Sequence, residues 1–103
     1  MTRIYIAGPM TGIVDLNYPA FHAAAAKLRA LGFEVENPAE NPEQPSWQHY
    51  MRLAVRQLAS CDAVALLPRW EHSCGAKEEF RLAQVLGIEC KPLMDWLLAE
   101  CVR

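Results

Sequence analysis

Short apolar runs of strand length alternate along the chain with longer segments whose apolar residues recur at helical spacing. The first run, Arg3–Ala7, stops at the breaker pair Gly8-Pro9. The run Ala63–Leu67 is apolar throughout, as expected of a parallel strand covered on both faces. With two shorter β-prone runs, the pattern predicts strands at residues 3–7, 33–36, 63–67 and 88–90.

The segments between these runs carry the start and stop signals of helices. Pro19 suits a first helical turn, and Gly32 suits a C-terminal stop. Ser46 is an N-cap residue, and Gly87 closes the third segment. The Pro-rich stretch 37–45 fits neither a helix nor a central strand and is the longest predicted loop. The predicted helices cover residues 19–31, 47–58, 75–86 and 93–102.

Strands and helices alternate strictly in this prediction, and such alternation implies right-handed crossovers and a parallel sheet. The predicted fold class is α/β, a three-layer sandwich around a small parallel sheet of four or five strands, flavodoxin-like or Rossmann-like. A chain of 103 residues has room for one core, so we expect a single domain over residues 1–103. Ligands of such folds bind beyond the carboxyl ends of the strands, where the loops after the first and third strands lie.

Composition narrows the classes of partner. Hydrophobic residues make up 52% of the chain and charged residues 21%, which is a globular mix. The formal net charge of -2, with scattered charges, offers no basic face for duplex nucleic acid. No apolar run approaches the roughly 20 residues that span a bilayer, and Met1-Thr2-Arg3 leads directly into a strand. We therefore expect a cytoplasmic protein with neither duplex nucleic acid nor membrane as a partner.

Cysteine and histidine spacing indicates neither a metal centre nor a disulfide framework. The four cysteines contain no Cys-x-x-Cys pair, and the three histidines show no metal-like spacing. We expect reduced thiols, surface histidines and no metal or other cofactor. Cys74 supports a rival hypothesis of a thiol enzyme, because a helix N-terminus favours the thiolate, but the sequence offers it no paired base.

One carboxylate departs from the amphipathic pattern of the third predicted helix. At about 100° per residue the apolar side chains share one arc, and Glu79 falls inside it, between the directions of Ala83 and Leu86. Glu79 must therefore point toward the sheet or into a cavity, and a buried carboxylate there needs a reason. The structural alternative is a carboxylate that favours the positive helix end and bonds a nearby backbone amide. Glu78 lies on the polar arc, where solvation is expected.

The residues around Glu79 resemble the signature of the nucleoside 2-deoxyribosyltransferase-like superfamily. The run is Ser73-Cys74-Gly75-Ala76-Lys77-Glu78-Glu79, followed by Ala83 and Leu86-Gly87. Further matches resemble one small branch, the domain of unknown function DUF4406, which is common in phages and bacteria. They comprise Gly8-Pro9-Met10-Thr11-Gly12, Asn17, Phe21, Asn37-Pro38 and Cys61-Asp62. The resemblance extends to about Cys90.

The resemblance implies that Glu79 is a catalytic nucleophile at the centre of a nucleotide-sized pocket. In the characterised relatives the matching glutamate attacks the anomeric carbon of a deoxyribosyl group and expels the base. Water then completes hydrolysis, or another base completes transfer. Ser73 matches the serine that touches the 5′-phosphate in relatives acting on nucleoside monophosphates, and free amides of Gly75 and Ala76 at the helix start favour an anion. The alternative for Ser73 is an ordinary helix cap.

The remaining substrate-binding candidates lie in the two loops at the strand ends. The resemblance implies that the backbone of Gly8, Pro9, Met10 and Gly12 approaches the ligand, as small residues allow. Trp70 offers an aromatic face on which a base can stack. Plain turn formation is the alternative for the glycines and Pro9.

Two positions depart from the pattern of the characterised relatives. Ala54 stands where they have an aspartate that helps to position the sugar and the nucleophile. Thr11 stands where relatives that bind monophosphates use a basic side chain. The other carboxylates considered for the missing role are Asp15, Asp62 and Glu71.

These departures keep a second hypothesis open, a non-catalytic nucleotide-binding sensor or phage-host accessory protein. Under either hypothesis the partner is a small nucleoside or nucleotide. The relatives also imply a homodimer whose pocket lies at the subunit boundary. The apolar face of the second helix or the terminal helix would hold the two copies together.

Overall fold

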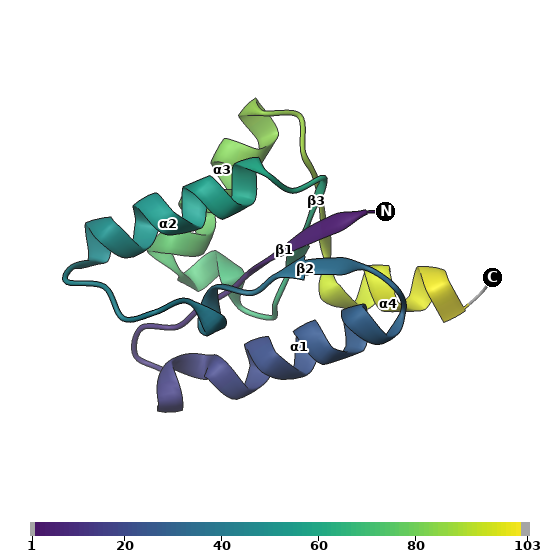
Figure 1. Cartoon of the computed structure of the whole chain (residues 1–103), viewed down its shortest axis with the longest axis horizontal. Helices are drawn as coiled ribbons and strands as arrows, with labels where there is room; N and C mark the ends of the chain where they lie inside the picture. The colour runs from purple at the N-terminus through teal and green to yellow at the C-terminus, as the bar shows by residue number, and fades with distance from the viewer. Residues whose placement is uncertain (1, 102–103) are drawn as a thin grey trace.

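A parallel sheet of four strands forms the middle layer of the molecule (Figure 1). The computed structural model describes the backbone of residues 2–101 and the side chains of residues 2–99. The strands stand in the order β2-β1-β3-β4, so β1 and β3 are central and β2 and β4 form the edges. Their bounds are Arg3–Ala7 for β1, Glu34–Glu36 for β2, Ala63–Leu66 for β3 and Glu89–Pro92 for β4.

Helices connect the strands in the predicted order and cover both faces of the sheet. They are α1 (Tyr18–Ala30), α2 (Trp47–Ala59), α3 (Cys74–Val85) and α4 (Leu93–Cys101). Short 3-10 turns, named η1 to η3, lie in the loops at Val14–Asn17, Pro38–Glu40 and Trp70–His72. The α/β prediction with a parallel sheet is therefore confirmed. Within residues 2–101 no helix combines the length and hydrophobicity that a bilayer crossing requires.

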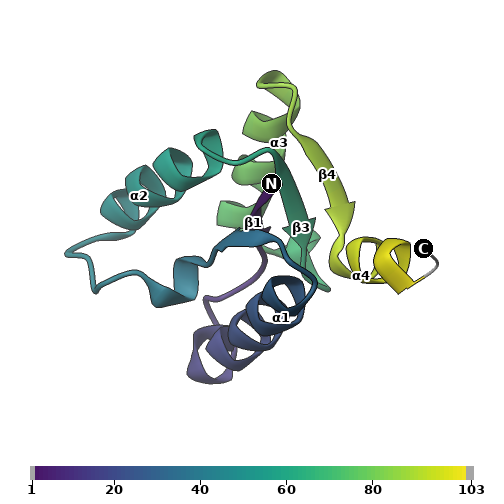
Figure 2. The same ribbon diagram turned by 45° about the vertical axis from the view of Figure 1, so that its right-hand side comes forward.

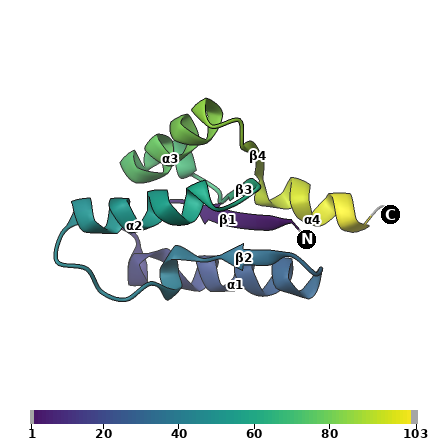
Figure 3. The same cartoon turned by 45° about the horizontal axis from the view of Figure 1, so that its top comes forward.

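The two faces of the sheet carry separate cores. Alternate residues of β1 divide between them: Ile4 and Ile6 pack under α1 and α4, whereas Tyr5 and Ala7 pack under α2 and α3. Figure 3 shows α1 below β1 and α3 above it. The core on the α2–α3 side contains Tyr5, Ala7, Ala54, Leu58, Cys61, Val64, Leu66 and Ala83. Any polar group on this side must find its partner between the sheet and these two helices.

Helix ends follow the predicted signals. The Ser46 hydroxyl accepts a hydrogen bond of 3.2 Å from the backbone amide of His49 and caps α2. Gly32 and Gly87 have φ values of +96° and +72°, which the turns after α1 and α3 require. The long loop contains the 3-10 turn η2 and is tied to α2 by two hydrogen bonds of 2.8 Å between the side-chain amides of Asn41 and Gln57.

The fourth strand occupies residues 89–92 instead of the predicted 88–90. Ile88 belongs to the turn that closes α3, because its amide donates to the carbonyl of Ala83. The strand then pairs with β3 from Glu89 to Pro92, at the sheet edge that Figure 2 shows. Proline is tolerated there because an edge strand leaves one row of amides unpaired. The last helix follows directly, and the predicted helical residue Val102 lies outside the described residues.

Gly8 is held small by packing at the carboxyl end of β1. A Cβ atom at Gly8 would lie 2.7 Å from the Cβ of Leu67, closer than real Cβ atoms approach. The amide of Leu67 donates to the carbonyl of Ala7 at 2.8 Å, so the two segments cannot easily separate. The requirement for glycine here has a structural cause whether or not a ligand approaches.

Gly8→Ala is therefore expected to lower the free energy of unfolding by about 2 kcal/mol, the usual scale of overpacking. The control is Gly87→Ala, where φ is positive but no atom lies within 4 Å of the new Cβ. Only backbone strain of about 1 kcal/mol is expected at that position. Urea denaturation measures both, and an equal loss in the two variants would contradict the packing explanation.

Candidate functional site

Glu79 is the one charged residue buried among the described side chains. It lies in the second turn of α3 on the face turned to the sheet, and only 6% of it is exposed. The Tyr5 hydroxyl donates a short hydrogen bond to Glu79 Oε2, and Tyr5 itself is 1% exposed. The inward direction expected for Glu79 is therefore observed. Its partner is a tyrosine of the central strand rather than a backbone amide.

Burial changes the ionisation of this pair. Removal from water raises the pKa of the Glu79 carboxyl from 4.5 to about 7, and the hydrogen bond from Tyr5 opposes that rise. Burial also raises the pKa of the Tyr5 hydroxyl well above its usual value, and the neighbouring Glu79 charge adds to the effect. Tyr5 is thus a permanent hydrogen-bond donor, while Glu79 changes its charge near neutral pH. A carboxyl group in this state can act as a nucleophile once it is ionised.

The surroundings of Glu79 are otherwise apolar. Ala54 is buried on α2 in the same core as Tyr5, so the position discussed for an aspartate presents a methyl group. Asp62 cannot take its place, because it lies before β3 at the amino end of the sheet and accepts a bond of 2.9 Å from the amide of Arg3. Asp15 and Glu71 are exposed in loops. Glu79 therefore relies on Tyr5 alone for a polar partner among the described side chains.

The start of α3 is capped by its own sequence. The Ser73 hydroxyl accepts a hydrogen bond of 3.1 Å from the amide of Ala76, which is the ordinary cap considered for this residue. The amide of Ala76 is therefore occupied, which corrects the expectation that it is free. Gly75, the next residue of the predicted site, faces α2. The sulfur of Met51 lies 3.4 Å from where a Gly75 Cβ would be.

The residues of the loop after β1 differ in burial and in what they contact. Pro9 is buried, and its carbonyl accepts a bond of 2.9 Å from the Asn17 side chain. Met10 packs against the core under α1 and α4, which is the face opposite Glu79. Gly12 is exposed, with φ of +83° and open space around it. The structure therefore places this loop at the expected end of β1 without bringing the Met10 side chain to Glu79.

Trp70 follows β3 and packs on the outer part of α3. Its ring lies 4.7 Å from the ring of Phe80, centroid to centroid, with the planes tilted by 32°. One face of the indole is thus covered by the protein, and the residue remains half-buried. A base could therefore stack only on the part of the Trp70 ring that remains exposed.

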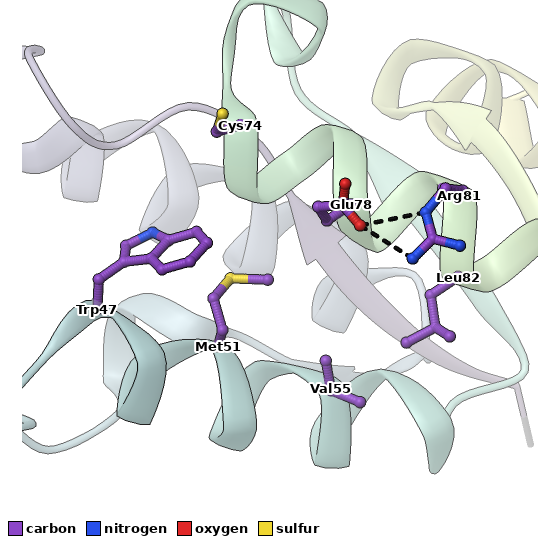
Figure 4. A pocket seen from close by; sticks show the side chains of 7 residues that line it. All are labelled: Trp47, Met51, Val55, Cys74, Glu78, Arg81 and Leu82. Carbon is purple, nitrogen blue, oxygen red and sulfur yellow. Dashed lines mark hydrogen bonds and ion pairs between the residues drawn. The ribbon is translucent and has the colours of Figure 1, made fainter.

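An open cavity of about 480 Å³ lies between α2 and α3 (Figure 4). Its walls are mainly apolar, and Glu78 and Arg81 form an ion pair of 3.0 Å at its edge. The lining residues are Trp47, Met51, Val55, Cys74, Glu78, Arg81 and Leu82. Glu79 is not among them, although its neighbour Glu78 is, so this cavity is not the predicted pocket centred on Glu79.

The cysteines and histidines were the other side chains considered for chemistry. Cys61, Cys74 and Cys90 are free, and burial raises the pKa of the Cys61 thiol to about 11. Cys74 is exposed at the cavity edge. No group of three or more His, Cys, Asp or Glu in the part of the chain described here is placed to hold a metal ion. His22 and His49 instead make local contacts with Asn37 and Ser46.

Two features of the site were not predicted from the sequence. The first is the hydrogen bond to Glu79 from Tyr5, a residue of the predicted first strand. A buried tyrosine hydroxyl nearly always has a hydrogen-bond partner. The inward direction predicted for Glu79 was therefore the signal that could have identified this pair. The second is Met51, whose place against Gly75 depends on how α2 and α3 cross. No sequence pattern reports that crossing.

Comparison with solved structures identifies the fold. A 2-deoxyribosyltransferase from Bacillus psychrosaccharolyticus is 20% identical, with a TM-score of 0.65, covering 85% of this chain and 69% of that one. A conserved protein from Enterococcus faecalis V583 is 26% identical, with a TM-score of 0.66, covering 87% of this chain and 61% of that one. The chain thus spans about two thirds of the length of these structures. At such identities the deoxyribosyltransferase likeness establishes the architecture alone.

No curated protein matches the chain. A family model does, over residues 2–91, which include every strand up to β4 and the whole of α1, α2 and α3. That model is described as a domain of unknown function, DUF4406. The match contains both members of the buried Tyr5–Glu79 pair and the capped start of α3. The chain is therefore a member of the DUF4406 family, with the α/β fold that 2-deoxyribosyltransferases share.

Proposed function

We propose that this protein cleaves the N-glycosidic bond of a nucleoside or nucleoside 5′-monophosphate, with Glu79 as the nucleophile. The observation that carries the proposal is the buried carboxylate bonded to Tyr5 and surrounded by apolar side chains, on a helix, α3, that also lines an open cavity. A charge placed there destabilises the fold unless it has a use. The fold shared with a 2-deoxyribosyltransferase supports the same choice of chemistry.

The reaction follows from the geometry of one carboxylate. A Glu79 oxygen forms a bond to the anomeric carbon while the bond from that carbon to the base nitrogen breaks, and the base leaves with the electron pair. The ionised carboxylate stabilises the positive charge that develops on the sugar. Water then attacks the anomeric carbon, gives its proton to solvent and releases Glu79, or a second base attacks in its place. Tyr5 holds the carboxylate throughout as a positioning residue.

The polar end of the substrate is assigned to the start of α3. Ser73 already accepts one bond from Ala76, but its own hydroxyl hydrogen remains able to donate to a ligand. Gly75 and Ala76 would border the ligand at this helix end. We keep the loop residues Gly8, Pro9, Met10 and Gly12, together with Trp70, as the proposed remainder of the binding site. No metal or other cofactor is needed for this chemistry.

A second candidate function is a non-catalytic sensor of the same ligands. The observation that favours it is Ala54, which puts a methyl group where catalysis would benefit from a second carboxylate. A sensor or phage-host accessory protein would bind a nucleotide without turnover. The two candidates differ in whether free base appears.

The deciding experiment incubates the protein with a panel of deoxynucleosides and their 5′-monophosphates and follows free base by chromatography. Wild type is expected to release base from at least one member. Glu79→Gln is expected to lower the rate by about 1000-fold or more, as the loss of a nucleophile does. The matched control is Glu89→Gln, on the edge strand and exposed, which is expected to stay within about twofold because a solvated surface group contributes little. Tight binding without base release by wild type would favour the sensor.

The pH dependence of base release tests the role of Tyr5. Because the ionised form of Glu79 is the nucleophile, the rate should rise with pH and level off above the pKa of about 7. The Tyr5 hydrogen bond lowers that pKa, so Tyr5→Phe is expected to move the rise toward alkaline pH by about one unit. The rate is measured from pH 5 to pH 9. An unshifted profile in Tyr5→Phe would show that the hydroxyl does not control the ionisation of Glu79.

We also propose that the protein is a homodimer joined through the face formed by α2 and α3. Trp47 is 53% exposed and Tyr50 is 37% exposed on α2, and large aromatic side chains are typical of interface cores. The cavity between the helices is open on this side, so a second copy would enclose it. This would place the pocket at a subunit boundary.

Sedimentation equilibrium at micromolar concentration tests the dimer. Wild type is expected to have twice the chain mass of 11.6 kDa. Trp47→Glu is expected to be monomeric, because it places a charge in the proposed interface. Val85→Glu is the control, since Val85 is 71% exposed at the far end of α3 and is not a lining residue of the cavity. A monomeric wild type would overturn the proposal.

We propose the cytoplasm as the location of the protein. The cysteines at 61, 74 and 90 are free in the structure, as expected in a reducing compartment. Nucleosides and their monophosphates are small soluble molecules, so the proposed reaction requires no membrane partner.

A further inference from the structure

The interface between α2 and α3 ends in a contact between a flexible side chain and a glycine. The sulfur of Met51 on α2 lies 3.4 Å from the point where a Cβ of Gly75 would be. Gly75 is in the first turn of α3, and any longer side chain at that position would compete with Met51 for the same space. The thioether therefore fills a place that Gly75 leaves empty.

The residues on either side of this contact form two facing stripes. On α3, Gly75 precedes Glu79 and Ala83 at intervals of four residues, so the three lie on one helix face. On α2, Met51 precedes Ala54 and Leu58 at intervals of three and four residues, which also gives one face. Both helices follow parallel strands and run in the same direction. The contact between Met51 and Gly75 thus lies one helical turn from Glu79, toward the start of both helices.

Met51 also belongs to the wall of the open cavity. It lines the cavity together with Trp47 and Val55, and Figure 4 shows it projecting from α2 toward α3. Glu79 is absent from that wall, while its neighbour Glu78 is part of it. Met51 is therefore shared between the cavity wall and the packing against Gly75, which lies one helical turn before Glu79 on α3.

We infer that Met51 is a gate between the cavity and Glu79. Methionine suits this role, because its side chain is unbranched and rotates about three bonds within a packed environment. Rotation of the thioether away from Gly75 would uncover the first turn of α3 and the carboxylate behind it, and no backbone movement is required. Val55 is β-branched and restricted in rotation, so it serves as fixed wall.

The inference deepens the proposed function by naming the route to Glu79, and it depends on that function only for the identity of what enters. A buried nucleophile reacts only if the sugar can reach it. The open conformation, in which Glu79 can react, would then be the less populated of the two. The gate would also admit substrate without exposing Glu79 permanently to water.

Chemical labelling of Glu79 tests the gate without any substrate. The protein is treated at pH 6 with a water-soluble carbodiimide and glycine methyl ester, and the labelled carboxyl groups are located by mass spectrometry of peptides. If the open state holds roughly one molecule in ten, Met51→Ala should raise the labelling rate of Glu79 about tenfold. Met51→Leu keeps the volume and should label at the wild-type rate.

Two controls separate gating from general loosening. Val55→Ala removes a side chain from the same cavity wall and should leave Glu79 labelling within about twofold of wild type, as expected for a residue outside the gate. Thermal unfolding of each variant is recorded, and labelling is done well below the lowest midpoint. Equal Glu79 labelling in wild type and Met51→Ala would overturn the inference, as would an equal increase in Val55→Ala.

The labelling result is independent of the base-release assay. If wild type releases no base but Met51→Ala exposes Glu79, the gate stands and the proposed chemistry fails. If base is released but Glu79 labelling does not respond to Met51→Ala, the chemistry stands and the gate fails.

Discussion

The hydrogen bond from the Tyr5 hydroxyl to Glu79 joins the centre of the sheet to the helix above it. Everything else between β1, α2 and α3 is apolar, so this bond is what permits a carboxyl group to remain inside the core. It also sets where the carboxyl oxygens point. Without a donor in the strand the group would have to stay protonated or turn outward. The position of the Glu79 side chain is thus decided by a residue far from it in sequence.

The two faces of the sheet serve different purposes. The face under α1 and α4 is packed with aliphatic and aromatic side chains, and the indole of Trp96 bonds the carbonyl of Val64 at 3.0 Å within it. The face under α2 and α3 has an apolar core of its own, and it also encloses the buried Tyr5–Glu79 pair. The two helices that cover this face line the open cavity as well.

Much of this arrangement could be predicted from the sequence because it depends on local patterns. The alternation of runs predicted the parallel sheet, and the helical wheel predicted that Glu79 points inward. What could not be predicted depends on contacts between elements. The partner of Glu79 follows from which face of β1 meets α3, and the position of Met51 follows from how α2 lies against Gly75. Ser73 illustrates the limit, since one residue type fits a helix cap and a ligand contact equally well, and only the cap is visible in an isolated chain.

The burial of Glu79 has a thermodynamic consequence for the whole fold. Its carboxyl pKa is about 7 in the folded chain and 4.5 as the unperturbed value, so acid conditions leave it neutral in both states. Between these two values folding takes up a proton, and stability declines as pH rises. At pH values above about 7, the buried carboxylate lowers the free energy of unfolding by about 3 kcal/mol relative to acid conditions. That loss is a sizeable share of the stability of so small a domain. A chain that had no use for this acid would gain robustness at neutral pH by exchanging it for a neutral side chain.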